Sequence, residues 1–168
     1  MKRLFAITLC FSLLIGCGNT STDTAVVQGN DTRSFGGAYE GTLELQATVD
    51  AIGASPKSDN DSISVEVNIA GNGVMRLTIE ESILDGIIDN NGDWELKISV
   101  NNLGSLIDGK SMTTLKEVGC PLDKKFAKID GKVTPPMISG EVTGKLSCKV
   151  LLVTVGTLEV SGTLTAKE

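Results

Sequence analysis

Few side chains in this sequence could perform acid–base, nucleophilic or metal chemistry. The chain of 168 residues has four cysteines and no histidine, so neither Ser-His-Asp nor Cys-His catalytic machinery can form. A zinc site built on imidazole and a histidine-based pH switch are excluded for the same reason. The remaining candidates are two short runs of Asp and Asn, one cluster of lysines and one pair of adjacent glutamates.

Two runs of oxygen-bearing side chains are candidates for a calcium site. They are Asp89-Asn90-Asn91-Gly92-Asp93 and Asp59-Asn60-Asp61-Ser62. Neither run matches the longer loop of an EF-hand, with its fixed glycine and its closing acidic residue. We therefore interpret the first as a polar hairpin turn, judge the second in the same way, and predict no metal ion and no cofactor.

One cluster of basic residues stands out, formed by Lys124, Lys125, Lys128 and Lys132. Lys128 and Lys132 alternate with Ile129, which places them on the solvated face of a strand. Lysines in this position commonly protect the edge of a sheet from pairing with another chain. Binding to lipopolysaccharide phosphates or to another anionic envelope component is the alternative.

Catalysis by paired carboxylates is the last chemical possibility. Glu80 and Glu81 are adjacent, and adjacent residues of a strand point to opposite faces, so the two could not act together on one glycosidic bond. The sequence contains no nucleophile elbow and no phosphate loop. We therefore predict that the protein is not an enzyme.

The N-terminal segment has the pattern of an export signal. Lys2 and Arg3 precede a mainly apolar stretch at residues 4–15, which is too short to span a membrane as a helix. The stretch ends in Leu14-Ile15-Gly16-Cys17, which resembles the lipobox of bacterial lipoproteins. The resemblance implies that residues 1–16 are a signal peptide cleaved before Cys17, and that Cys17 carries diacylglycerol and an acylated amino group.

The resemblance also bears on location. In lipoproteins an Asp directly after the lipidated cysteine often marks retention in the inner membrane, whereas Gly18 follows Cys17 here. This implies an anchor in the outer membrane, with the inner membrane as the alternative, and a domain in the periplasm or at the cell surface. Two or three acyl chains on one residue anchor a protein firmly.

Removal of the signal peptide changes the charge and the cysteine count. Two positive charges and no negative ones leave, so the formal charge falls from −6 to −8, which argues against nucleic acid as a partner. Cys10 leaves and Cys17 is lipidated, so Cys120 and Cys148 remain. An isolated pair in an oxidising compartment predicts a disulfide; a two-cysteine metal site is the disfavoured alternative.

The chain after Cys17 divides into a tether and a folded domain. Residues 17–37 are rich in Thr, Ser, Asn, Asp and Gly, a composition typical of a flexible linker. Residues 38–168 form the domain, in which apolar and polar residues alternate strictly in most segments, as in half-buried strands. A less regular stretch predicts a short helix over residues 112–118 with Ser111 as its N-cap, or a further strand.

The strands are predicted to form one all-β domain, a single antiparallel meander of eight or nine strands. Several glycines fall in register with the apolar residues of their strands: Gly41, Gly131, Gly140, Gly144 and Gly162. Inward glycines allow close backbone approach and sharp coiling, which a small closed barrel needs more than a flat sheet does. We therefore favour a small closed or nearly closed β-barrel, with a β-sandwich as the alternative.

A membrane-spanning barrel would need aromatic girdles at both interfaces. The chain after Cys17 has only four Phe, Tyr and Trp residues: Phe35, Tyr39, Trp94 and Phe126. We therefore expect a barrel that does not itself span the membrane.

These expectations describe an envelope lipoprotein with a non-enzymatic barrel. Two functions remain open. The barrel binds a small apolar ligand or a partner, or it is a structural lipoprotein that contacts other envelope proteins.

Overall fold

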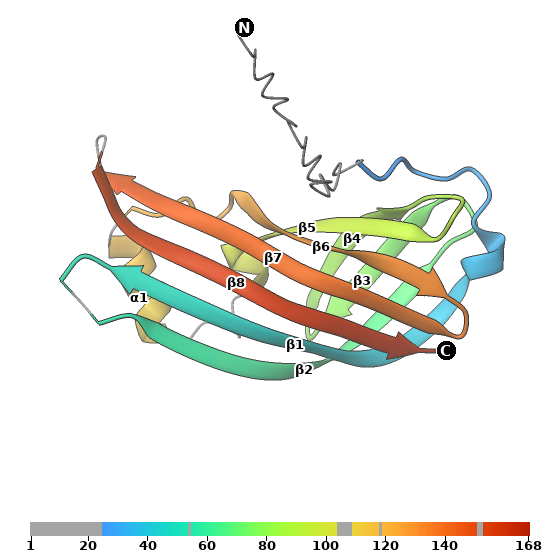
Figure 1. Cartoon of the computed structure of the whole chain (residues 1–168), viewed down its shortest axis with the longest axis horizontal. Helices are drawn as coiled ribbons and strands as arrows, with labels where there is room; N and C mark the ends of the chain where they lie inside the picture. The colour runs from blue at the N-terminus through green and yellow to red at the C-terminus, as the bar shows by residue number, and fades with distance from the viewer. Residues whose placement is uncertain (1–24, 54, 104–108, 118, 151–152) are drawn as a thin grey trace, which may run out of the picture.

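The computed structural model describes residues 25–53, 55–103, 109–117, 119–150 and 153–168. Eight antiparallel strands follow one another around a closed barrel, in the order β1-β2-β3-β4-β5-β6-β7-β8 (Figure 1). The predictions of an all-β meander and of a closed barrel are confirmed, and the β-sandwich is excluded. The first and last strands close the barrel, since β1 pairs with β8 from Glu40↔Lys167 to Ala51↔Gly156.

The strands are β1 (Gly37–Ala51), β2 (Lys57–Ile69), β3 (Val74–Ile79), β4 (Ser82–Ile88), β5 (Asp93–Ser99), β6 (Lys125–Thr134), β7 (Met137–Val150) and β8 (Val153–Lys167). Two 3-10 turns, η1 (Arg33–Phe35) and η2 (Val100–Leu103), and one helix, α1 (Gly109–Glu117), complete the described elements. The helix was predicted over residues 112–118 with Ser111 as its N-cap. It begins at Gly109, two residues before Ser111, so Ser111 lies inside the helix.

The inward positions of the strands hold a packed apolar core. The largest fully buried side chains are Trp94, Tyr39, Leu43, Met75, Leu77, Ile88, Ile98, Leu103, Leu115, Ile129, Ile138 and Leu158. Leu103 and Leu115 belong to η2 and α1; the other ten lie in strands, where alternation places them inside and their polar neighbours outside. The barrel is therefore filled by its own side chains over the described strands.

Inward glycines bring neighbouring strands and the tryptophan together. Gly131 pairs directly with Trp94 on β5 and with Gly140 on β7. A Cβ atom on Gly140 would lie 2.5 Å from Cζ2 of Trp94, and a Cβ on Gly131 would collide with the carbonyl oxygen of Ser139. The close approach predicted for these two positions is confirmed: the indole of Trp94 lies where a side chain of Gly140 would be, and the backbone of β7 lies where a side chain of Gly131 would be.

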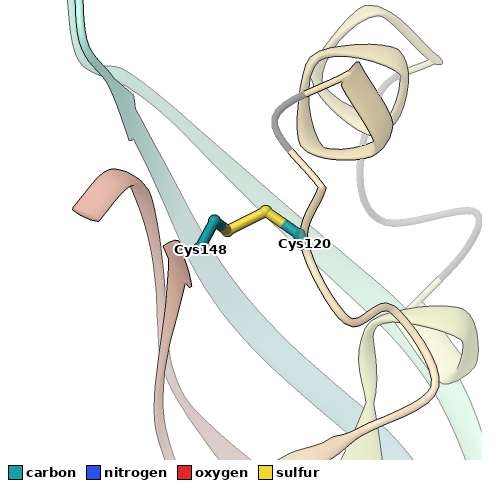
Figure 2. The surroundings of a disulfide bond; sticks show 2 residues. All are labelled: Cys120 and Cys148. Atoms are coloured by element: carbon teal, nitrogen blue, oxygen red, sulfur yellow. A yellow bond between two sulfur atoms is a disulfide. The ribbon is translucent and has the colours of Figure 1, made fainter. Parts of the chain in front are cut away.

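The α1 end of the barrel is covered by the segment between β5 and β6. Leu103 and Leu115 of this segment are buried. The chain after α1 is bonded to the end of β7 by a disulfide between Cys120 and Cys148, as Figure 2 shows. The predicted disulfide is confirmed. It fastens the chain after α1 to one of the longest strands.

The opposite end of the barrel is crossed by residues that were predicted to belong to the flexible tether. The N–H of Gly29 donates to the carbonyl of Ile88 (2.8 Å), and the N–H of Thr32 donates to the carbonyl of Gly71 (3.1 Å). The Thr32 hydroxyl is wholly buried; it donates to the carbonyl of Ala70 (2.7 Å) and accepts from the N–H of Gly73 (2.9 Å). Residues 29–36 thus belong to the folded domain, and the predicted tether boundary at residue 37 is wrong.

The first residues of β1 are joined to the same segment. The Tyr39 hydroxyl donates to the carbonyl of Phe35 (2.9 Å), and burial of the ring, with a smaller contribution from the charge of Glu168, raises the pKa of Tyr39 above its usual value. A composition-based prediction of the tether misses this end of the chain because its polar side chains hydrogen-bond to turns that are far away in the sequence.

The strands differ greatly in length. The long strands β1, β2, β7 and β8 lie side by side and reach past the short strands β3, β4 and β5 (Figure 1). As a result β2 pairs with β1 from Lys57↔Val49 to Ile69↔Gly37, but pairs with β3 only from Val65↔Ile79 to Ile69↔Met75. One edge of β2 therefore continues beyond the last residue of β3.

Candidate functional site

A groove with a volume of about 590 Å³ lies on the outer face of the barrel, across β5, β6, β7 and β8. Its floor includes the backbone around Trp94, Gly131 and Gly140, where the strands approach most closely. Its polar lining comes from outward positions of the four strands: Asp93, Glu95, Lys128, Asp130, Lys132, Ser139, Glu141, Thr163 and Thr165. Val26, from the segment before β1, also borders the groove.

Three carboxylates form a row across the groove. Glu95 pairs directly with Asp130, and Asp130 pairs directly with Glu141. Like charges directly opposite one another on neighbouring strands destabilise a sheet, so this row is not explained by strand pairing. The Glu95 side chain is only 16% exposed, which places its carboxylate within the groove.

Lysines offset part of this charge. In each case the distance is from a lysine Nζ to a carboxylate oxygen. It is 2.8 Å from Lys132 to Asp93 Oδ1. It is 3.4 Å from Lys128 to Asp130 Oδ1 and 3.9 Å from Lys97 to Glu95 Oε1. An exposed pair such as Lys132 with Asp93 contributes at most about 1 kcal/mol. The groove combines carboxylates, ammonium groups and hydroxyls, and so can bind polar or charged surface groups of a partner.

Two lysines of the cluster lie on the outer face of their strand, as the alternation predicted, but they do not protect an edge of the sheet. Lys128 and Lys132 are on the outer face of β6. The interpretation as edge protection is wrong, because β6 lies between β5 and β7 in a closed barrel and has no open edge beside these residues. Their proximity to Asp130 and Asp93 also means that they do not form a surface of one charge that would attract an anion.

Residues 89–92 form the turn between β4 and β5, as predicted, and Asp93 is the first residue of β5. Asp89 Oδ1 accepts hydrogen bonds from the N–H groups of Asn91 (2.8 Å) and Asp93 (2.9 Å). Asn90 Oδ1 accepts from the N–H of Asp31 (3.1 Å). The oxygens of Asp89 and Asn90 are thus used within the turn and in holding the N-terminal segment against it.

The other two acidic candidates lie in elements that the sequence did not predict. The run Asp59-Asn60-Asp61-Ser62 was judged to be a turn, but it is part of β2, so that interpretation is wrong. Glu80 and Glu81 are not strand residues; they form the turn between β3 and β4, where Glu80 has a φ of 51°. The argument from opposite faces of a strand therefore does not apply to this pair.

Cys17, Cys10 and the lipobox lie outside the described residues, so lipidation remains a prediction. Within the described part of the chain, no group of three or more His, Cys, Asp or Glu side chains is arranged to hold a metal ion. None of the described helices is long and apolar enough to cross a bilayer.

The fold and the groove together define a closed eight-stranded antiparallel barrel with a packed interior and a polar outer groove. In comparisons with known proteins, no family model matches the chain and no curated protein is significantly similar to it. The sequence analysis missed the groove because Glu95, Glu141 and Thr163 are far apart in the chain. Only the register of four strands brings them together.

Proposed function

We propose that this protein is a lipid-anchored envelope lipoprotein whose barrel is a structural module that binds other envelope proteins through its outer surface. The anchor is supported by the lipobox resemblance at Leu14-Ile15-Gly16-Cys17. The choice of a structural module over a carrier of apolar ligands is carried by one observation, the packed interior. Large side chains such as Trp94, Leu43 and Ile129 are fully buried at inward positions.

The outer surface of the barrel has two polar hollows in which a partner protein could bind. The charged groove over β5 to β8 and a second hollow across β1, β2 and β8 are both lined mainly by polar residues. Electrostatic complementarity of such surfaces gives specificity and faster association. These features support a partner-binding role for the outside of the barrel.

Replacement of Cys17 by alanine is expected to abolish anchoring. The variant lacks the thiol that would accept diacylglycerol, so we expect no incorporation of labelled palmitate and release of the protein from the membrane fraction. Cys10→Ala is the matched control, because Cys10 lies within the signal peptide and should leave lipidation intact. A Cys17→Ala protein that fractionates with membranes as the wild type does would contradict the proposal.

The packed interior is expected to exclude apolar ligands. Trp94 is the single tryptophan of the chain, and its Nε1 is a buried donor without a hydrogen-bond partner among the described residues. A ligand that entered the core would pack against this ring and change its fluorescence. We expect titration of the mature lipoprotein with fatty acids to leave the Trp94 emission unchanged, and native mass spectrometry to find no bound small molecule.

A stoichiometric apolar molecule in the purified protein, or a saturable change in Trp94 emission, would instead support the carrier function. The structural role has its own positive test. A photo-crosslinking residue at Ser139, in the groove, is expected to trap an envelope protein. The same residue at Ala38, an exposed position outside the groove, is the control.

A further inference from the structure

The edge of β2 at residues 57–64 has no neighbouring strand on the side away from β1 in the described part of the chain. The ladder between β2 and β3 ends at Val65↔Ile79, while β1 continues to pair with β2 as far as Lys57. Such an edge is rare in a closed barrel, because closure normally gives every strand two neighbours. Residues 57–62 are exposed on both faces of the strand.

The backbone groups that point toward this edge are those of the even-numbered residues. The N–H of Ala70 donates to the carbonyl of Val74 on β3 (2.9 Å), and backbone groups of a strand point to alternate sides. The N–H groups of Asn60 and Ser62 therefore point away from β1. Each donates to the carboxylate of the preceding residue, Asn60 to Asp59 (3.0 Å) and Ser62 to Asp61 (2.8 Å).

Negative charge is concentrated along and beside this edge. Asp59 and Asp61 lie on it, and the turn formed by Glu80 and Glu81 follows directly after Ile79, where the free edge begins. Lys57, at the far end of the edge, offsets one of these four negative charges. The corresponding part of β7 differs. There the ladder to β6 ends at Gly144↔Ala127, but Cys148 is bonded to Cys120, so the chain after α1 lies against that strand.

A second copy of this chain does not fit the edge. A two-fold symmetric pairing would be antiparallel through the same even-numbered residues. The registers that pair most of the edge with itself place Asp61 opposite Asp59, or Asp61 opposite its own counterpart. Carboxylates directly opposite one another oppose pairing, so the charge of the edge favours a partner with basic side chains.

We propose that the free edge of β2, from Ser58 to Ser64, accepts an additional β-strand from a partner, an extended segment with Lys or Arg at alternate positions. The cationic side chains pair with Asp59 and Asp61 and draw the carboxylates away from the backbone. The N–H groups of Asn60 and Ser62 then donate to carbonyl groups of the added strand, as in other cases of strand addition. This inference rests on the proposed partner-binding role and names the contact that carries it.

The test uses the mature lipoprotein in detergent and a synthetic peptide that alternates lysine with threonine or valine. We expect this peptide to bind and to slow hydrogen exchange at the amides of Asn60 and Ser62. A peptide with glutamate in place of lysine should not bind. A lysine peptide N-methylated at alternate residues keeps its charge but cannot pair with a strand edge, and we expect at least about a tenfold loss of affinity.

Two double variants separate the edge from the groove. Asp59→Asn with Asp61→Asn keeps a side-chain oxygen that can accept from the backbone N–H, so the fold should persist, and we expect about a tenfold weaker affinity for the lysine peptide. Glu95→Gln with Glu141→Gln removes the same charge from the groove. This control should change the affinity by less than about twofold.

The inference is overturned if the lysine peptide does not bind, if the N-methylated peptide binds equally well, or if the groove variant loses binding and the edge variant does not. Failure here is distinguishable from failure of the proposed function. A crosslink from Ser139 to an envelope protein, without peptide binding at β2, would preserve the structural role. An apolar molecule bound in the core would remove that role without bearing on the edge.

Discussion

Gly131→Ala is expected to lower the free energy of unfolding by about 3 kcal/mol, the upper end of the usual range for overpacking, because the atoms around this site cannot move aside. The added Cβ would collide with the carbonyl oxygen of Ser139 and approach the Cα of Gly140 at 2.5 Å. Both atoms belong to the backbone of β7, so no side chain can rotate away. Urea denaturation followed by the emission of Trp94, which pairs with Gly131, measures the effect.

Gly36→Ala is the control for this substitution. Gly36 has a φ of −66°, and the nearest atom to an added Cβ is the Arg33 carbonyl oxygen at 3.4 Å. A glycine in a conformation that alanine adopts readily gives a change between zero and a stabilisation of about 1 kcal/mol. If Gly131→Ala and Gly36→Ala have the same unfolding free energy, the close approach of β6 and β7 does not constrain the barrel.

Removal of the disulfide is the second substitution with a large expected effect. The two cysteines are separated by 28 positions in the sequence, and the chain-entropy model gives about 3.6 kcal/mol for a loop of this length. Cys120→Ala with Cys148→Ala should therefore unfold at a clearly lower urea concentration than the oxidised wild type. Faster hydrogen exchange is expected in α1, because the bond holds the chain after this helix against β7.

The reduced wild type provides the internal comparison for the disulfide. With a thiol reductant present, its unfolding midpoint should fall to near that of the double variant, whereas the midpoint of the double variant should not move. Equal stability of the oxidised wild type and the double variant would show that the covalent link does not stabilise the domain.

The alternation of apolar and polar residues was sufficient to predict the strands, the meander and the inward-facing glycines. It works because a half-buried strand exposes one face to water and one to the core. Gly131 and Gly140 fell on the inward side of that pattern, and their lack of a side chain predicted the coiling that closes the barrel. The pairing of Cys120 and Cys148 followed from the number of cysteines and the predicted compartment.

The pattern fails where a strand has no buried face or where contacts depend on register. Residues 57–62 are exposed on both faces, so this part of β2 has no alternation and its Asp and Asn residues resemble a turn. Thr32 resembles a linker residue because its partners, Ala70 and Gly73, are remote in sequence. The groove was hidden for the same reason, since it depends on the register of four strands.

The hydrogen bonds that hold Gly29 and Thr32 against the barrel have a mechanical consequence. A pull on the chain before Gly29 would not peel β1 away from β8 one hydrogen bond at a time. It would load first the bonds from Gly29 to Ile88 and from Thr32 to Ala70, Gly71 and Gly73. These bonds end on β4 and on the turn between β2 and β3, and not on the pair of strands β1 and β8 that closes the barrel. A pull on the N-terminal segment is therefore shared by several strands before it reaches that pair.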